Sequence, residues 1–244
     1  MKIKLLGVLF LLSINLSAQK ITKKSLNEIQ KTNFKKTLKN ALKYNDVQTA
    51  INNLHNIIVL EGDNSSYKDS LAIVYYKSGS YLSSHLITKE LLAKKPNNIE
   101  LLEINAVSLQ KLNAVKEAID AYEILFSKTN NMAHGYQLAN LQYSIKRLAE
   151  AKNTITKTLQ CKEIEKAFIQ FPIDKKQSQN APLKAAVYNL KGIISFDLKE
   201  YTEASNSFNE ALKIMPKFAL ATQNANAVLI TLQNQKKNTS ITKK

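Results

Sequence analysis

Residues 185–192 read Ala-Ala-Val-Tyr-Asn-Leu-Lys-Gly, and the run after them carries Tyr201, Ala204, Phe208, Ala211, Leu212 and Pro216. Spacings of three and four between apolar residues mark one face of an α-helix. Proline cannot continue a helix, so Pro216 marks an end. The stretch therefore predicts two helices joined by a short turn at Lys199-Glu200.

Ala204 belongs to a series of small residues that recur at a nearly constant interval. Ala50, Ser84, Ala118 and Ala151 are 34, 34 and 33 residues apart, and Ala204 follows after 53, one period plus 19 inserted residues. Self-similarity at this period indicates a solenoid of helix–turn–helix units, none of which can bury its apolar face alone.

The last unit resembles a tetratricopeptide repeat (TPR), with Tyr188 at the first aromatic place, Gly192 at the glycine and Ala204-x3-Phe208 in the second helix. Lys191 departs from the pattern, because leucine is usual there. The unit from about Asp63 to Pro96 repeats the scheme, and three more degenerate units are centred on Ala50, Ala118 and Ala151. The resemblance implies an all-α fold, a right-handed superhelical TPR solenoid of about five helix–turn–helix repeats plus a C-terminal capping helix.

The chain divides into segments on the same basis. We expect a signal peptide, a lead-in, four repeats, an insertion, a fifth repeat, a capping helix and a disordered basic tail. Their ranges are 1–18, 19–30, 31–165, 166–184, 185–216, 217–236 and 237–244 respectively.

The N-terminus has the layout of a secretory signal peptide. Lys2 and Lys4 precede the apolar run 5–12, and small residues lead to a cleavage site after Ala18. The apolar run is too short for a spanning helix, and no later segment approaches that length. We expect an exported protein, periplasmic or secreted, from a Gram-negative bacterium, without a membrane span once the signal is removed.

The charge of the chain is strongly positive, at +16. Such a balance raises anionic polymers as partners, whereas scattered lysines also serve solubility alone. Arg147 is the only arginine, although arginine is favoured for bidentate phosphate recognition. We therefore expect no nucleic-acid partner and keep an anionic envelope polymer as an alternative.

The sequence contains no recognisable motif for catalysis or for binding a cofactor. The glycines are isolated, and His55, His85 and His134 fall in different repeats without metal-ligand spacing. Glu100 and Glu103 have the spacing of a solvated helix face. Cys161 is the only cysteine, which excludes an internal disulfide. We expect a non-enzyme with no cofactor and no metal.

The resemblance implies that the first helix of each repeat lines a concave groove in which peptides bind. By alignment, the inward positions are Lys35, Lys39, Lys43, Tyr76, Lys77, Lys111, Tyr143 and Phe196. A groove that is basic at one end, with aromatic platforms, suits an acidic-aromatic peptide or a C-terminal carboxylate. Lysine near a helix C-terminus is also favoured by the helix dipole alone.

The insertion begins with apolar residues of extended character, 168–173, and continues with polar, loop-like residues up to Pro182. Two interpretations remain open: the apolar part packs on its own repeat, or Phe168 and Phe171 contact a partner. Together these patterns predict an exported TPR scaffold that binds a protein or peptide in its groove and assembles envelope or secretion components. The alternative is a binder of an anionic envelope polymer or polysaccharide through the lysine-rich surface.

Overall fold

A computed structural model describes residues 25–162, 167–173 and 177–241 of the chain. The predicted signal peptide and the first six residues of the lead-in lie outside these ranges. The lead-in from residue 25 onward already belongs to the first helix, α1, which is described from residue 25 to residue 43. The helix thus begins before residue 31, where the first repeat was expected to start.

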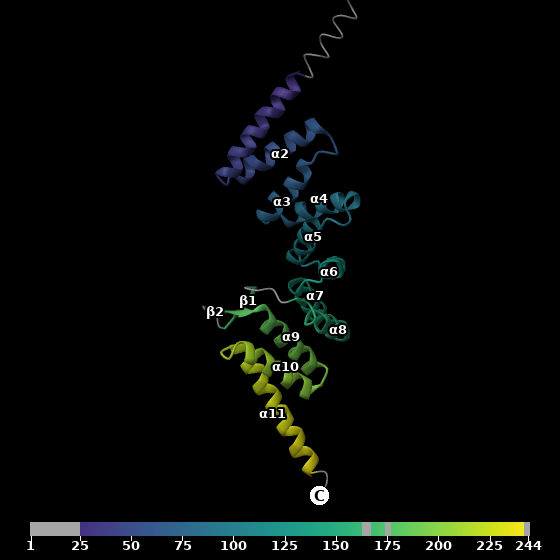
Figure 1. The fold of residues 1–244 in the computed structure, drawn as a ribbon, viewed down its shortest axis with the longest axis vertical. Helices are drawn as coiled ribbons and strands as arrows, with labels where there is room; N and C mark the ends of the chain where they lie inside the picture. The colour runs from purple at the N-terminus through teal and green to yellow at the C-terminus, as the bar shows by residue number, and fades with distance from the viewer. Residues whose placement is uncertain (1–24, 163–166, 174–176, 242–244) are drawn as a thin grey trace, which may run out of the picture. The chain divides into compact units, whose positions relative to one another are not determined.

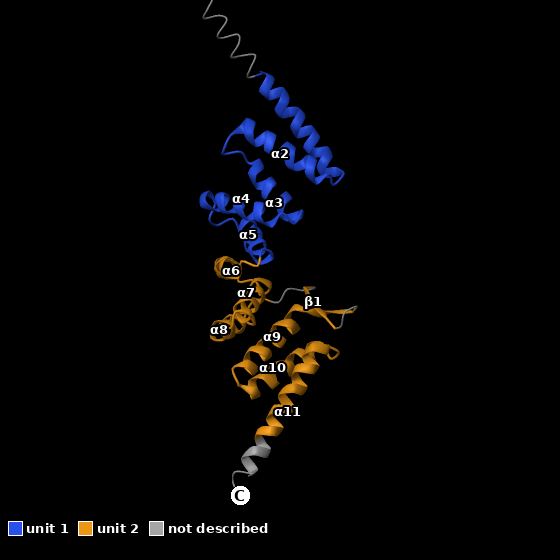
Figure 2. Ribbon diagram, turned by 180° about the vertical axis from the view of Figure 1, so that it is seen from behind, with its two compact units in different colours: residues 1–112 blue, residues 113–244 orange. Residues whose placement is uncertain are grey.

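The chain forms two compact units, residues 1–112 and 113–244 (Figure 2). In the first, α1 is followed by α2 (Val47–Glu61), α3 (Tyr67–Lys77), α4 (Tyr81–Lys94) and α5 (Ile99–Lys111). The second holds α6 (Val115–Thr129), α7 (Met132–Ser144), α8 (Leu148–Thr158), strands β1 (Phe168–Pro172) and β2 (Ser178–Pro182), α9 (Leu183–Asp197), α10 (Tyr201–Ile214) and α11 (Ala219–Ile241) (Figure 1). Consecutive helices pack on one another within each unit, as a helical solenoid requires.

The turn inside each predicted repeat has one residue in the left-handed backbone region. These residues are Asn45, Gly79, Asn113, Lys146 and Lys199, with φ between 56° and 79°. Each precedes the recurrent small residue of its repeat by five positions. In four of the turns the next N–H donates to the carbonyl five residues back, as Asp46 N does to Ala41 O over 2.8 Å and Glu200 N to Ser195 O over 2.9 Å. This bond closes the first helix and reverses the chain.

The recurrent small residues are among the most buried positions of the second helices. Ala50, Ser84, Ala118, Ala151 and Ala204 are each 1% exposed or less, as the 34-residue period predicts. Ser84 shows how close the helices come, because its hydroxyl donates to the backbone carbonyl of Ala72 on α3 over 3.1 Å.

Glycines on the first helices allow the same close approach from the other side. A methyl group added at Gly192 on α9 would lie 2.5 Å from the Phe208 ring on α10. Phe208 is 1% exposed, so its ring has no room to move away. The glycine of the TPR pattern on α9 and the phenylalanine of its Ala-x3-Phe element on α10 therefore pack against each other.

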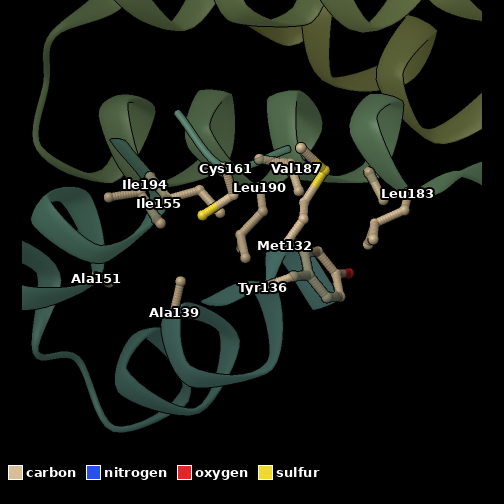
Figure 3. Close-up of a cluster of buried hydrophobic side chains, with 11 residues drawn as sticks. Met132, Tyr136, Ala139, Ala151, Ile155, Cys161, Leu183, Val187, Leu190 and Ile194 are labelled. Atoms are coloured by element: carbon tan, nitrogen blue, oxygen red, sulfur yellow. The ribbon is translucent and has the colours of Figure 1, made fainter. Parts of the chain in front are cut away.

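A cluster of buried side chains joins α7, α8 and α9 in the second unit (Figure 3). Met132 and Tyr136 of α7 face Leu183, Val187 and Leu190 of α9 in this cluster. The hydroxyl-bearing Tyr136 is only 7% exposed, and burial raises its pKa to about 12. The insertion between α8 and α9 therefore leaves the stacking of the fourth and fifth repeats intact.

The insertion forms an antiparallel hairpin in which Phe168 pairs with Pro182 and Pro172 with Ser178. The extended character of the first strand was expected, but the prediction of a loop up to Pro182 is wrong for β2. Gln179 of β2 fastens the hairpin to the start of α11, since its side chain donates to Lys217 O and accepts from Ala219 N. The polar sequence of β2 does not indicate a strand. Its hydrogen bonds to β1 and the contacts of Gln179 stabilise the extended conformation.

The last helix, α11, covers α9 and α10 through Ala221 and Val228, both fully buried. Its position agrees with the expected capping helix, but it continues to Ile241. The prediction of a disordered tail is thus wrong for residues 237–241, and residues 242–244 lie outside the description. No proline or glycine occurs after Pro216, and each further residue adds one backbone bond to an existing helix.

Replacing Gly192 with alanine should destabilise the protein. The new methyl group overlaps the buried Phe208 ring, and overpacking of this kind typically costs about 1–3 kcal/mol, more than the ~1 kcal/mol that alanine gains in a helix. Urea unfolding followed by circular dichroism measures the change. As a control, Asn206→Ala at an exposed position of α10 should leave stability unchanged or slightly higher. Equal stability of the Gly192→Ala variant and the wild type would contradict the close contact.

Raising the pH above about 10 should destabilise the fold through Tyr136. The unfolded chain releases the phenol proton near pH 10, whereas the folded state holds it up to about pH 12. Ionisation therefore favours unfolding, and linkage predicts a loss of about 1 kcal/mol between pH 9 and pH 11. Tyr136→Phe should show a smaller fall over this range, by about that amount. Parallel pH dependences of the two proteins would refute the assignment.

Candidate functional site

The first helices of the second and third repeats, α3 and α5, enclose a hollow of about 220 Å³ in the first unit. Each helix contributes three residues at spacings of three and one, which lie on one helical face. The lining residues are Ile73, Tyr76, Lys77, Glu100, Glu103 and Ile104. We call these residues, together with Leu42, the first-helix face.

Tyr76 is the aromatic residue of this face, as the alignment predicted. Its ring is half-buried and meets Tyr81 edge-on, with 6.2 Å between ring centroids. Burial raises the pKa of the Tyr76 phenol, and the negative charge of Glu103 adds to the effect. The phenol therefore remains a neutral hydrogen-bonding group at physiological pH.

Lys77 lies between two hollows of the first unit. Besides the one shared with Tyr76, it lines a smaller hollow of about 100 Å³ with Leu42 and Asp46. Leu42 is 54% exposed, so an apolar surface adjoins the ammonium group. Among the predicted lysines, Lys77 has the surroundings of a binding residue.

The other exposed lysines among the predicted inward positions of the groove are Lys39, Lys43 and Lys111. Lys43 places its ammonium 5.2 Å from the centre of the Tyr44 ring. The groove is not uniformly basic, however, because Glu100 and Glu103 line the same hollow as Lys77. Both glutamates are exposed, as expected of a solvated helix face, but that interpretation missed the part of the hollow formed by α5.

Lys35, also predicted to face the groove, makes its contacts within the fold. Its ammonium pairs with Glu61 at 3.2 Å and lies 5.0 Å from the centre of the Tyr67 ring. The hydrogen bond to Glu61 raises the pKa of Lys35, while a hydrogen bond from Ser65 lowers the pKa of Glu61. Lys35 thus holds α1 against the connection between α2 and α3.

The two predicted platforms of the second unit are engaged within the fold. Tyr143 donates its hydroxyl to Asp197 over 3.0 Å, and Lys146 reaches the same carboxylate at 3.1 Å. Burial, followed by the Asp197 bond, raises the pKa of Tyr143. Phe196 meets Tyr201 at 5.5 Å and packs against the cluster under α11. Tyr143 and Phe196, predicted as aromatic positions of the groove, therefore already make contacts within the fold.

The two phenylalanines of the insertion differ, and each follows one of the open interpretations. Phe171 is half-buried and packs on Phe218, with 5.1 Å between ring centroids. Phe168 is 57% exposed. The hairpin therefore packs on its own repeat through one aromatic ring and presents the other to solvent.

The histidines are held by separate hydrogen bonds. His55 bonds to Tyr75 over 2.9 Å, His85 to Asn105 over 2.8 Å and His134 to Thr129 over 2.8 Å. Within residues 25–162, 167–173 and 177–241, no three His, Cys, Asp or Glu side chains gather where a metal ion could be held. Cys161 is buried, and burial raises the pKa of its thiol.

Many of the lysines carry out structural tasks. Lys152 of α8 lies 2.5 Å from Glu200 and 2.9 Å from Glu203, and Lys191 of α9 lies 3.1 Å from Glu203. These contacts tie α8, α9 and α10 together, and the bond from Lys152 lowers the pKa of Glu203. The charges of Lys152 and Lys191 are therefore partly neutralised by the glutamates with which they pair.

Comparison with solved structures places this arrangement among known folds. A tetratricopeptide repeat protein from Parabacteroides merdae is similar over 86% of this chain and 77% of its own, with a TM-score of 0.60 and 14% identity. YrrB, described as a TPR protein with an unusual peptide-binding site, is similar over 76% of this chain and 87% of its own, with a TM-score of 0.59 and 15% identity. This chain has the fold of TPR proteins.

MamA from Desulfovibrio magneticus shares the fold over 78% of this chain and 97% of its own, with a TM-score of 0.57 and 12% identity. No protein-family model and no curated protein matches the sequence. Among the helices that the structure describes, none is both long enough and apolar enough to cross a membrane.

Replacing Lys152 with methionine should destabilise the second unit. Methionine keeps much of the apolar stem but removes the charge that Glu200 and Glu203 share. Bonds to charged groups are worth roughly 1.5–3 kcal/mol, and partial exposure reduces this to about 1 kcal/mol. The free energy of urea unfolding measures the loss. Lys213→Met is the matched control, since its Glu210 pair lies at the surface, and it should change little. Equal effects would show that the α8–α10 network is not special.

Proposed function

We propose that this chain is an exported scaffold protein that binds a peptide segment of a partner protein on the first-helix face, and that it holds envelope or secretion components together in this way. The observation that carries the proposal is the hollow between α3 and α5. It brings an aromatic ring, two isoleucines and charges of both signs together on the helices that form the peptide groove in TPR proteins.

The size and lining of the hollow favour a peptide over a small ligand. Pockets for small molecules usually measure roughly 300–1,000 Å³, whereas this hollow measures about 220 Å³. It suits one apolar side chain, seated between Ile73 and Ile104, with the rest of the peptide lying across the helices. The peptide-binding site in the description of YrrB supports this class of ligand for the fold.

The charges around the hollow revise the expected peptide. Lys77 would attract a carboxylate, whereas Glu100 and Glu103 would repel an acidic segment and attract a basic group. We propose a segment with an apolar side chain flanked by one acidic and one basic residue, rather than an acidic-aromatic tail.

Export and the lack of catalysis are further parts of the proposal. Lys2, Lys4 and the apolar run up to Leu12 support a signal peptide for an envelope protein of a Gram-negative bacterium. The isolated hydrogen bonds of the three histidines offer no catalytic arrangement, which supports a binding role.

A binder of an anionic envelope polymer is the second candidate. The excess of 35 basic over 19 acidic side chains favours it, whereas the pairing of Lys35, Lys68 and Lys152 with glutamates reduces the free positive surface. Polyelectrolyte binding falls steeply with salt, while burial of an apolar side chain persists. Salt therefore separates the two functions.

Affinity capture with residues 19–244 should retain a small set of envelope proteins after a high-salt wash. Lys77→Glu should reduce their recovery at least about tenfold, because it replaces the attractive ammonium with a third carboxylate beside the hollow. Lys89→Glu, an equal charge change at an exposed position of α4, should recover them like the wild type. Quantitative mass spectrometry of the eluates gives the ratio. Equal loss in both variants, or recovery of polymer alone at low salt, would overturn the first-helix proposal.

A further inference from the structure

A larger hollow, of about 770 Å³, lies in the second unit between α6 and α8, with Leu138 and Gln142 of α7 at its floor. Its walls contain Glu123 and Phe126 of α6, Asn130 directly after α6, and Glu150, Asn153 and Lys157 of α8. Spacings of three and four residues place the members from each helix on one helical face. The hollow therefore runs along the two helices, and we call it the α6–α8 hollow.

The length of the α6–α8 hollow fits a short extended chain. From Glu123 to Asn130 a helix advances about 10 Å, at roughly 1.5 Å per residue. An extended peptide advances about 3.3 Å per residue, so about three residues lie between the walls.

The floor holds a buried side-chain amide whose hydrogen bonding is incomplete. Gln142 of α7 is 3% exposed and donates its Nε2 to Glu123 Oε1 over 3.4 Å. Its Oε1 is buried and accepts no hydrogen bond from the part of the chain that the structure describes. A buried acceptor without a partner is unfavourable, so a donor in the hollow that the Gln142 side chain turned to meet would be stabilised there.

The charge of the hollow is opposite to that of the whole chain. Glu123 and Glu150 outnumber Lys157 along the walls, whereas the chain carries a net charge of +16. Glu150 has an exposed partner, Arg147, at 3.4 Å, and Glu123 accepts only the neutral amide of Gln142 among the contacts above. Among these contacts Glu123 is therefore the carboxylate that no cation offsets, and such a group attracts a cation.

Exposed amides at the rim favour a peptide over a simple cation or a sugar. Asn130, Asn153 and Gln160 are exposed and line the hollow. Each side-chain amide has both a donor and an acceptor, as a peptide bond does. The aromatic ring in the lining, Phe126, is half-buried and can contact the apolar stem of a long side chain.

We propose that the α6–α8 hollow binds a short extended segment of a partner protein that carries an arginine or lysine side chain. Glu123 and Glu150 receive the cationic group, and the amides of Asn130 and Asn153 hold the backbone of the segment. The site uses other helices and other residues than the first-helix face, so it does not depend on the function proposed above.

Nuclear magnetic resonance of the ¹⁵N-labelled chain (residues 19–244) tests the site with two probes. These are the peptides acetyl-Ser-Ala-Arg-Ala-Ser-amide and acetyl-Ser-Ala-Glu-Ala-Ser-amide. The arginine peptide should shift the side-chain amide signals of Asn130, Asn153 and Gln160, whereas the glutamate peptide should leave them in place. Glu123→Gln with Glu150→Gln should weaken the arginine peptide at least about tenfold, as expected for the loss of charge-assisted bonds.

The matched control removes two charges from the same region without touching the hollow. Glu117→Gln with Asp120→Asn changes exposed positions of α6 outside the lining and should bind the arginine peptide like the wild type. Equal shifts from both peptides, the absence of shifts at the three amides, or shifts there with maltotriose in place of the arginine peptide would overturn the proposal. If the Glu123/Glu150 variant failed to fold, the contrast between the two peptides would still decide it.

Discussion

The close approach of paired helices at one small residue per repeat is the contact on which the rest of the structure depends. Ala50, Ala151 and Ala204 are fully or almost fully buried, and a larger side chain there would separate the helices. Since no repeat has a core of its own, each pair must stack on its neighbours to bury its apolar faces. The contact therefore fixes the packing and, through it, the positions of the residues that face outward from the first helices.

The sequence predicts this contact well because it depends on residue size at a fixed interval. It predicts the turns less well. Glycine and asparagine at positions 79 and 45 favour a left-handed backbone, whereas Lys146 and Lys199 adopt it although they have no such preference. The geometry of the helix pair imposes the turn there, and the bond that closes the helix compensates for the strain. The second strand of the hairpin was missed for a similar reason, because its pairing and its Gln179 anchor involve residues far away in the chain.

The candidate site could be predicted only as a set of positions on helices. Alignment places Tyr76 and Lys77 on the same helical face, because their positions in the repeat decide it, and both line one hollow. It cannot identify the partner that a neighbouring helix brings to a side chain. Lys35 meets Glu61, and Tyr143 meets Asp197, so both are used for packing. The same limitation concealed the role of Glu100 and Glu103, which become part of the site only when α5 lies beside α3.

The distribution of charge suggests how a lysine-rich chain can still select its partners. Attraction by scattered lysines acts over about a Debye length and does not distinguish one anionic surface from another. Selectivity requires groups held at fixed distances around a space of defined size. In this chain the glutamates supply that element, since Glu100 and Glu103 in one unit and Glu123 and Glu150 in the other line the hollows. Each hollow also has a lysine in its lining, Lys77 in one and Lys157 in the other, so charges of both signs lie at defined positions. Two hollows of this kind on one chain would let it hold two segments at once, and each bound segment would raise the effective concentration of the other.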